Sequence, residues 1–293
     1  MGTKEKFWFE HTDGNRWLFK FNRHGHGDDW SERVASEVAG LLGLPRGHVE
    51  LATFEGRSGV ICRDFTRRKE LSLVHGNELL VALVDPQYPK GQNYRVTGHT
   101  VERVCSILDQ KWIGRPEGFG EVEGIVNATD VFSGYLMLDA LVGNTDRHHE
   151  NWAVVLVPAN DPPGSVRRYV ARLAPTFDHA SCLGFNLRDT ERIDRMTPGR
   201  NRSVESFADR AVSKLYLQVD APKPLSPLEA FAEATRGRAR TRKAWIERLR
   251  LIADEQFDQI IAPVPAERMS QAARAFAGAL LRLNKARIAG LNP

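Results

Sequence analysis

The sequence predicts an α+β chain of two lobes, a small mixed β-rich lobe over residues 1–83 and a larger, mostly helical lobe over residues 84–293. Short runs in which aromatic or β-branched residues alternate with other residues are concentrated in the first lobe and indicate strands. Apolar residues at helical spacing dominate the second. Between them, residues 85–98 hold two prolines and two glycines, a composition typical of a crossing loop.

The small lobe is expected to contain four strands around one helix. Asp13-Gly14-Asn15 has the composition of a hairpin turn between the first two strands. The helix is expected over residues 31–42, where apolar residues keep helical spacing until Gly43 and Pro45 end it. The expected strands are Phe7–Phe9, Trp17–Phe21, Val49–Phe54 and Gly59–Ile61.

In the larger lobe, helical spacing predicts six helices, at residues 100–108, 127–142, 206–216, 227–234, 242–253 and 268–288. Two β-rich runs, residues 152–157 and 166–171, interrupt this pattern and predict a hairpin. Residues 186–203, rich in Arg and Asp, are expected to be a mobile segment.

The most informative stretch is the polar decapeptide, residues 143–152, which lies between an expected helix and an expected strand and reads GNTDRHHENW. Asp146 and Asn151 are five positions apart, the separation of the catalytic Asp and the metal-binding Asn in the protein-kinase catalytic loop. An Asp there can accept the proton of an attacking hydroxyl, and an Asn can give an amide oxygen to a metal on the nucleotide phosphates. Phosphoryl transfer is therefore the first hypothesis.

A second carboxylate, Asp178, follows the expected hairpin and should face the same cleft. Mg²⁺ prefers oxygen ligands, so Asn151 and Asp178 are the expected metal ligands. His148 is interpreted as an orienting hydrogen-bond donor beside Asp146, and His149 as a surface residue. Two adjacent histidines without a nearby Cys or a spaced third His make a poor zinc set.

The second strand carries one lysine, Lys20, among aromatic residues. This is the place of the phosphate-binding lysine in a kinase small lobe, and the following helix supplies Glu32 and Glu37 as candidate partners. Gly2 and Thr3, ahead of the first strand, would form a very short cover for the phosphates.

These segments together resemble the HipA-like serine/threonine kinases. The resemblance is carried by GTKEKF at residues 2–7, WLFKFN at 17–22, SERVASEVAGLLGLP at 31–45, GNTDRHHEN at 143–151 and LAPTFD at 173–178. It implies a two-lobed protein-kinase-like fold. Full-length members of the family carry an additional N-terminal subdomain. The matching segments here begin at residue 2, so we expect a member that lacks it.

The resemblance also implies roles for individual residues. Lys20 would hold the phosphates of ATP, Asp146 would be the catalytic base, and Asn151 and Asp178 would bind Mg²⁺. Alignment back from residues 43–45 favours Glu32 over Glu37 as the partner of the lysine. The other expected nucleotide-binding residues are Gly2 and Thr3 in the phosphate loop, and Cys62 and Asp64 in the inter-lobe hinge at residues 59–65.

The expected activity is therefore ATP-dependent phosphorylation of a protein Ser or Thr. By resemblance the substrate could be a translation component, and the chain could be the toxin of a toxin-antitoxin pair with a small antitoxin partner. Two alternatives stay open, a lipid or small-molecule kinase and an ATP-binding regulatory module.

Composition limits the remaining classes. The chain has 293 residues, is 42% hydrophobic and 27% charged, and shows no signal peptide or membrane span. Its three scattered cysteines favour a reducing cytoplasm. The net charge of +4 and the pI near 9.0 raise the question of nucleic-acid binding. The densest basic run, residues 236–250, interleaves with apolar residues at helical spacing, so an amphipathic helix is favoured over direct nucleic-acid binding.

Overall fold

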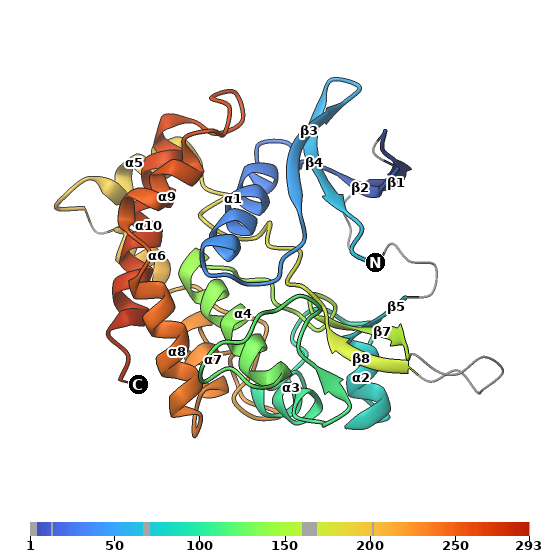
Figure 1. Cartoon of the computed structure of the whole chain (residues 1–293). Helices are drawn as coiled ribbons and strands as arrows, with labels where there is room; N and C mark the ends of the chain where they lie inside the picture. The colour runs from blue at the N-terminus through green and yellow to red at the C-terminus, as the bar shows by residue number, and fades with distance from the viewer. Residues whose placement is uncertain (1–4, 13, 67–70, 160–168, 201, 293) are drawn as a thin grey trace.

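A computed structural model describes residues 5–12, 14–66, 71–159, 169–200 and 202–292. Two four-stranded sheets occupy one side of the molecule and most of the helices occupy the other (Figure 1). The first sheet lies above the second in this view, and α1 lies beside the first. The expected α+β architecture is confirmed.

The first sheet has the strand order β1-β2-β4-β3 and is antiparallel throughout. Its register places Lys20 opposite Val60 and Leu18 opposite Cys62. Its strands are β1 (Lys6–Glu10), β2 (Arg16–Phe21), β3 (Val49–Phe54) and β4 (Arg57–Arg63).

Alternation along β2 separates two faces of this sheet. Phe19 and Phe21 lie on one face, where they pack with Phe7 and Phe54 at ring-centroid distances of 4.8 to 6.3 Å. Successive side chains on a strand point to opposite faces, so Lys20 points to the other one. The aromatic cluster thus fixes the direction of the lysine.

Helix α1 (Asp28–Leu41) packs against β3 and β4. Its inner side carries Val34, Ala35, Val38 and Ala39, each at most 1% exposed. Gly43 follows the helix at φ +66°, the left-handed conformation that commonly ends helices. The sequence-predicted helix is confirmed, with its start three residues earlier.

The second sheet has the order β5-β7-β8-β6, and β7 and β8 form the expected hairpin. Its strands are β5 (Ser72–His75), β6 (Ile113–Gly114), β7 (Ala153–Pro158) and β8 (Tyr169–Leu173). β5 pairs with β7, so the second sheet already begins at residue 72. The lobe boundary at residue 83 stays a prediction from turn composition, which carries no information about strand pairing.

Helix α4 (Ala128–Val142) is the central helix of the larger lobe, and each of its residues is buried. A helix that is buried on all sides belongs to the interior, and here it ends directly before the polar decapeptide. The surrounding helices are α2 (Gly76–Leu83), α3 (Val101–Leu108), α5 (Asp189–Met196), α6 (Val204–Ala208), α7 (Pro227–Ala234), α8 (Ala239–Arg250), α9 (Asp254–Ile261) and α10 (Gln271–Ala289).

One expected helix is largely absent. The sequence predicted it over residues 206–216, whereas α6 ends at Ala208. Beyond it, the Ser213 backbone N–H donates to Leu225 O, and the Tyr216 N–H donates to His99 O. Because these tertiary hydrogen bonds replace the helical ones, the chain is not helical there despite its helical spacing.

Candidate active site

Lys20, Glu32 and Asp178 meet between the two sheets, and we call them the Lys20 cluster. Lys20 Nζ donates to Glu32 Oε1 at 2.7 Å and to Asp178 Oδ1 at 3.0 Å. The side chains of Lys20 and Glu32 are 12% and 2% exposed, whereas that of Asp178 is 41% exposed. The cluster therefore has a buried end at Glu32 and an accessible end at Asp178.

The two carboxylates control the ionisation of the lysine. Burial alone would lower the pKa of Lys20, but the charges of Asp178 and Glu32 outweigh it and hold the pKa well above its usual value. Lys20 is therefore a fixed cation of the kind that can bind phosphate oxygens.

The structure brings Glu32 and not Glu37 to the lysine. Glu32 lies on the side of α1 that faces β2, while Glu37 pairs with Arg46 at 3.0 Å and with Arg33. Five residues correspond to about one and a half helical turns, which separates the two carboxylates around the helix. The preference for Glu32 agrees with this geometry.

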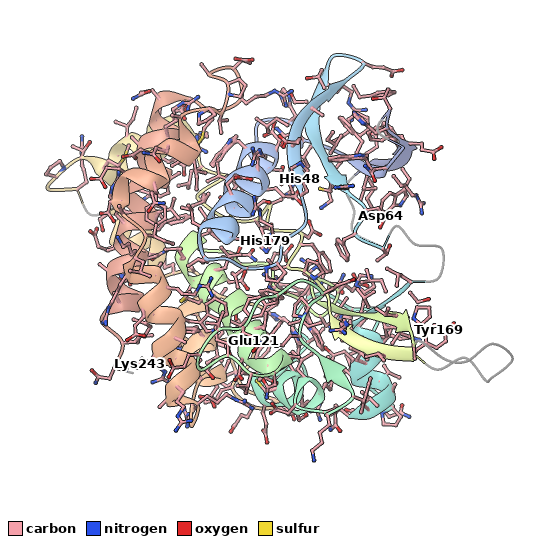
Figure 2. The ribbon with its side chains drawn as sticks, in the orientation of Figure 1. His48, Asp64, Glu121, Tyr169, His179 and Lys243 are labelled. Atoms are coloured by element: carbon pink, nitrogen blue, oxygen red, sulfur yellow. The ribbon has the colours of Figure 1, made fainter. Side chains whose placement is uncertain are left out.

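The expected hinge residues differ in their surroundings. Cys62 lies beside the Lys20 cluster, with Sγ 3.7 Å from Glu32 Oε1, and burial raises the pKa of its thiol. Asp64 lies after the end of β4 (Figure 2). Its carboxylate accepts from the backbone N–H and the hydroxyl of Thr66. Gly2 and Thr3 lie outside the described residues.

A buried ion pair between Arg147 and Asp139 anchors the polar decapeptide. Arg147 Nε donates to Asp139 Oδ2 at 2.7 Å and Arg147 Nη2 to Asp139 Oδ1 at 2.8 Å, a bidentate arrangement. The same guanidinium donates to Asn151 O at 2.7 Å and to Thr176 Oγ1 at 3.1 Å. Arg147 thereby ties the end of α4, the decapeptide and the segment before Asp178 together.

Asp146 and Asn151 are held close to each other. Asn151 Nδ2 donates to the carbonyl of Asp146 at 2.7 Å, and the Asp146 N–H donates to Asn144 Oδ1 at 3.1 Å. Because the amide nitrogen of Asn151 is bound to the loop, its oxygen is the group left to meet a cation. Asp146 also lies near Arg23. The hydrogen bonds that Arg23 donates to the Asp28 carboxylate are the main cause that raises the pKa of its guanidinium, and the charge of Asp146 adds to it.

Asp178 occupies a strained part of backbone space. Its φ is +60°, which is uncommon for any residue other than glycine and is found more often at functional sites. The segment that follows is tied to the small lobe, because Ser31 Oγ donates to Ala180 O at 2.6 Å. His179, labelled near α1 in Figure 2, lies 2.7 Å from Thr176 Oγ1 through its Nε2.

His148 and His149 point in different directions. The Glu150 N–H donates to His148 Nδ1 at 3.1 Å, so Nε2 is the nitrogen that can carry a proton to a neighbour. Burial lowers the pKa of His148, against the opposing charges of Asp146 and Asp178. The role of His148 as an orienting donor stays a prediction.

The expectation that His149 lies at the surface was wrong. His149 is 1% exposed, with Tyr88 Oη at 2.6 Å from Nδ1 and Asn93 Oδ1 at 2.8 Å from Nε2. Burial lowers the pKa of His149 to about 4. Its partners lie 61 and 56 residues earlier in the chain, where no local pattern shows them.

A second buried histidine supports the decapeptide and was missed in the sequence. Trp152 Nε1 donates to His99 Nε2 at 3.1 Å, which places the proton of His99 on Nδ1, 3.0 Å from Lys214 O. Burial lowers the pKa of His99 to about 3. Because Trp152 and Lys214 lie 53 and 115 positions from His99, no local sequence pattern shows this role.

The residues present fit a nucleotide with a magnesium ion. A cation would meet the oxygens of Asn151 and Asp178, and phosphates would meet Lys20. Within the described residues, no cluster of three or more His, Cys, Asp or Glu forms a site that could hold a metal without such help. A phosphate-bridged Mg²⁺ needs fewer protein ligands, because phosphate and water supply the rest.

The basic run at residues 236–250 is largely engaged within the protein. Arg238 pairs with Asp109 at 2.5 Å and with Asp130 at 3.3 Å, and Arg236 pairs with Glu233 at 2.6 Å. Arg250 donates to Ala289 O at the end of α10, and Arg242 donates to Ala232 O in α7 and to Asn292 O. These contacts agree with the interpretation of the run as part of an amphipathic helix. No helix within the described part of the chain is long and apolar enough to cross a bilayer.

Comparison with known proteins gives a family and two structural relatives. The family described as the HipA-like C-terminal domain matches residues 1–254. A kinase from Helicobacter pylori, the proinflammatory kinase CtkA, superimposes with a TM-score of 0.72 at 19% identity, over 98% of this chain and 90% of that one.

The second relative is HipA of Shewanella oneidensis MR-1, from a complex with HipB and its operator DNA. It superimposes with a TM-score of 0.61 at 14% identity, over 98% of this chain and 63% of that one. No curated protein sequence matches this chain. The family match covers most of the chain and the whole fold is shared with a kinase, so this protein belongs to the HipA-like C-terminal domain family and has its kinase-like fold.

Proposed function

We propose that this protein is an ATP-dependent kinase that transfers the γ-phosphate to a Ser or Thr hydroxyl of a protein. The observation that carries the proposal is the Lys20 cluster, which joins residues 12 and 158 positions apart in the sequence. A lysine with one buried and one accessible carboxylate, next to an Asp-Asn pair on a rigid loop, is the arrangement that phosphoryl transfer requires.

Each residue has a defined task in this proposal. Lys20 binds phosphate oxygens and Glu32 fixes its position. Asn151 and Asp178 hold Mg²⁺, which when bound neutralises charge on the phosphates. Asp146 accepts the proton of the attacking hydroxyl.

Positioning supplies most of the acceleration in such a reaction, because the protein forms no covalent bond with the phosphoryl group. The buried Arg147–Asp139 pair keeps the decapeptide in place while substrates bind and leave. The site thus combines a rigid support, the buried Arg147–Asp139 pair, with an accessible carboxylate, Asp178.

The family and the two relatives support further parts of the proposal. One relative is named a kinase, and the other is the HipA of a toxin-antitoxin system bound to HipB. We extend this to a small antitoxin as partner and to a translation component as one class of protein substrate, with the cytoplasm as the place of action.

Labelling of a cell lysate tests the function. Purified protein, Mg²⁺ and γ-labelled ATP should transfer label to protein, and an Asp146→Asn variant should not. Separation of the products into protein and lipid fractions distinguishes the alternatives. Label in lipid or small molecules would favour a lipid or small-molecule kinase, and nucleotide binding without transfer would favour a regulatory module.

A further inference from the structure

A cavity of about 140 Å³ lies in the larger lobe among α4, α6, α7 and α10. These helices pack on one another, with α10 running beside α6 and α8 in Figure 1. Protein interiors leave few spaces larger than a water molecule, and an apolar cavity of roughly 150 Å³ can hold benzene. The cavity is therefore large enough for a small organic ligand.

The walls of the cavity are mainly apolar. Leu280 and Ile288 of α10 are fully buried, and Phe207 and Leu228 contribute from α6 and α7. Asn284 is the buried polar residue of the lining, and its Nδ2 already donates to Leu141 O at 3.1 Å. A ligand body in this space would thus meet carbon atoms on most sides.

The mouth of the cavity carries charge. Arg287 Nη2 pairs with Asp209 Oδ1 at 2.8 Å, and their side chains are 28% and 64% exposed. An exposed ion pair contributes little to stability, so another carboxylate can replace Asp209 at low cost. The guanidinium can bind an incoming carboxylate with two parallel hydrogen bonds.

We infer that this cavity is a binding site for a small carboxylic acid with an apolar body about the size of a benzene ring. The apolar walls hold the body and Arg287 holds the carboxylate. The cavity is also lined by Gly143, the first residue of the polar decapeptide, so a bound ligand contacts the end of α4 from behind the active site. The inference concerns binding and does not depend on phosphoryl transfer.

The test uses benzoate and benzyl alcohol as probes, which share the ring and differ in charge. Binding is followed by the methyl NMR signals of Leu228, Leu280 and Ile288, with Leu51 in β3 as a remote control, and by the melting temperature. We expect benzoate to shift the three lining signals, to leave Leu51 unchanged and to raise the melting temperature.

Two kinds of variant separate shape from charge. Ala208 and Ala211 also line the cavity, so Ala208→Trp, or Ala211→Phe if the first fails to fold, should fill it and abolish both effects of benzoate. Arg287→Met keeps the apolar walls, and should weaken benzoate about tenfold while it leaves benzyl alcohol unchanged. Benzoate that shifts no lining signal, binds the filled variant equally, or binds Arg287→Met as it binds the wild type would overturn the inference.

Discussion

Lys20 Nζ lies 3.0 Å from Asp178 Oδ1, although the two residues are separated by 158 positions. Lys20 belongs to the first sheet, and Asp178 follows the last strand of the hairpin in the second sheet. The contact joins the small lobe to the segment that follows the hairpin of the larger one. A lysine and an accessible carboxylate in contact form a site where phosphate and Mg²⁺ can each replace one partner of the pair.

Glu32 and Glu37 provide a matched pair of substitutions on one helix. Glu32→Gln removes the buried charge that fixes Lys20, and we expect kcat/KM for ATP-dependent transfer to fall by about 10- to 100-fold. Glu37→Gln removes a carboxylate that pairs with Arg46 away from the site, so activity should stay within about twofold. Steady-state kinetics of both variants checks this, and equal losses would contradict it.

Asp178→Asn should make the affinity for ATP nearly independent of Mg²⁺. Asn tolerates the left-handed backbone at this position, so the fold is expected to be kept. For the wild type, the ATP affinity measured by calorimetry should differ between a buffer with Mg²⁺ and one with EDTA. For the variant, the two affinities should be nearly equal. A variant that keeps the wild-type difference would show that the negative charge of Asp178 is not needed for the binding of Mg²⁺ with ATP.

The Arg147–Asp139 ion pair should be essential for stability. Asp139→Ala leaves a buried guanidinium without its bidentate partner and should lower the free energy of unfolding by about 3–5 kcal/mol. Glu233→Gln, which breaks the surface pair with Arg236, should change it by less than about 1 kcal/mol. Urea unfolding of both variants gives the comparison, and similar small changes would refute the anchoring role.

Stability should decrease in acid because His99, His149 and His179 are buried, and burial lowers the pKa of each. The pKa of His99 is about 3 in the folded protein, below the value of about 6.5 in an unfolded chain. The unfolded state therefore binds more protons below about pH 6.5, and the stabilising contribution, complete above that pH, is lost as the pH falls towards 3. Between about pH 8 and pH 5, His99 alone should account for about 2 kcal/mol.

His99→Gln is the variant that checks this linkage. Its free energy of unfolding, measured in urea between about pH 8 and pH 5, should have a shallower pH dependence than that of the wild type. A variant with an unchanged slope would assign the acid sensitivity to other groups.

Local sequence patterns predicted much of the fold. The alternation in β2, the spacing in α1 and the run before Gly143 each correspond to an element in the structure, because side-chain burial follows the period of the backbone. Local patterns failed where tertiary contacts determine the structure of a segment. Residues 186–203 were expected to be mobile, whereas α5 forms there and Arg192 is buried through bonds to Asp189 and Gly184 O.

Part of the candidate site was also predicted from the sequence. Lys20, Glu32 and Asp178 were proposed from motif spacing and family resemblance, and the structure brings them into contact. The supports of the decapeptide were not found. His99 contacts Trp152 across 53 positions. Arg147 joins Asp139, eight positions earlier, to Thr176, 29 positions later, and no sequence motif specifies this arrangement.

The most direct test of the account is a comparison of wild type with Asp146→Asn in two measurements on the same protein. The variant lacks the proton acceptor but keeps the Lys20 cluster, Asn151 and Asp178. We expect Mg²⁺-ATP to raise the melting temperature of both proteins equally, and label transfer to protein to fall by about 10²- to 10⁴-fold in the variant. Transfer at the wild-type rate by Asp146→Asn would contradict the assignment of this loop as the catalytic one.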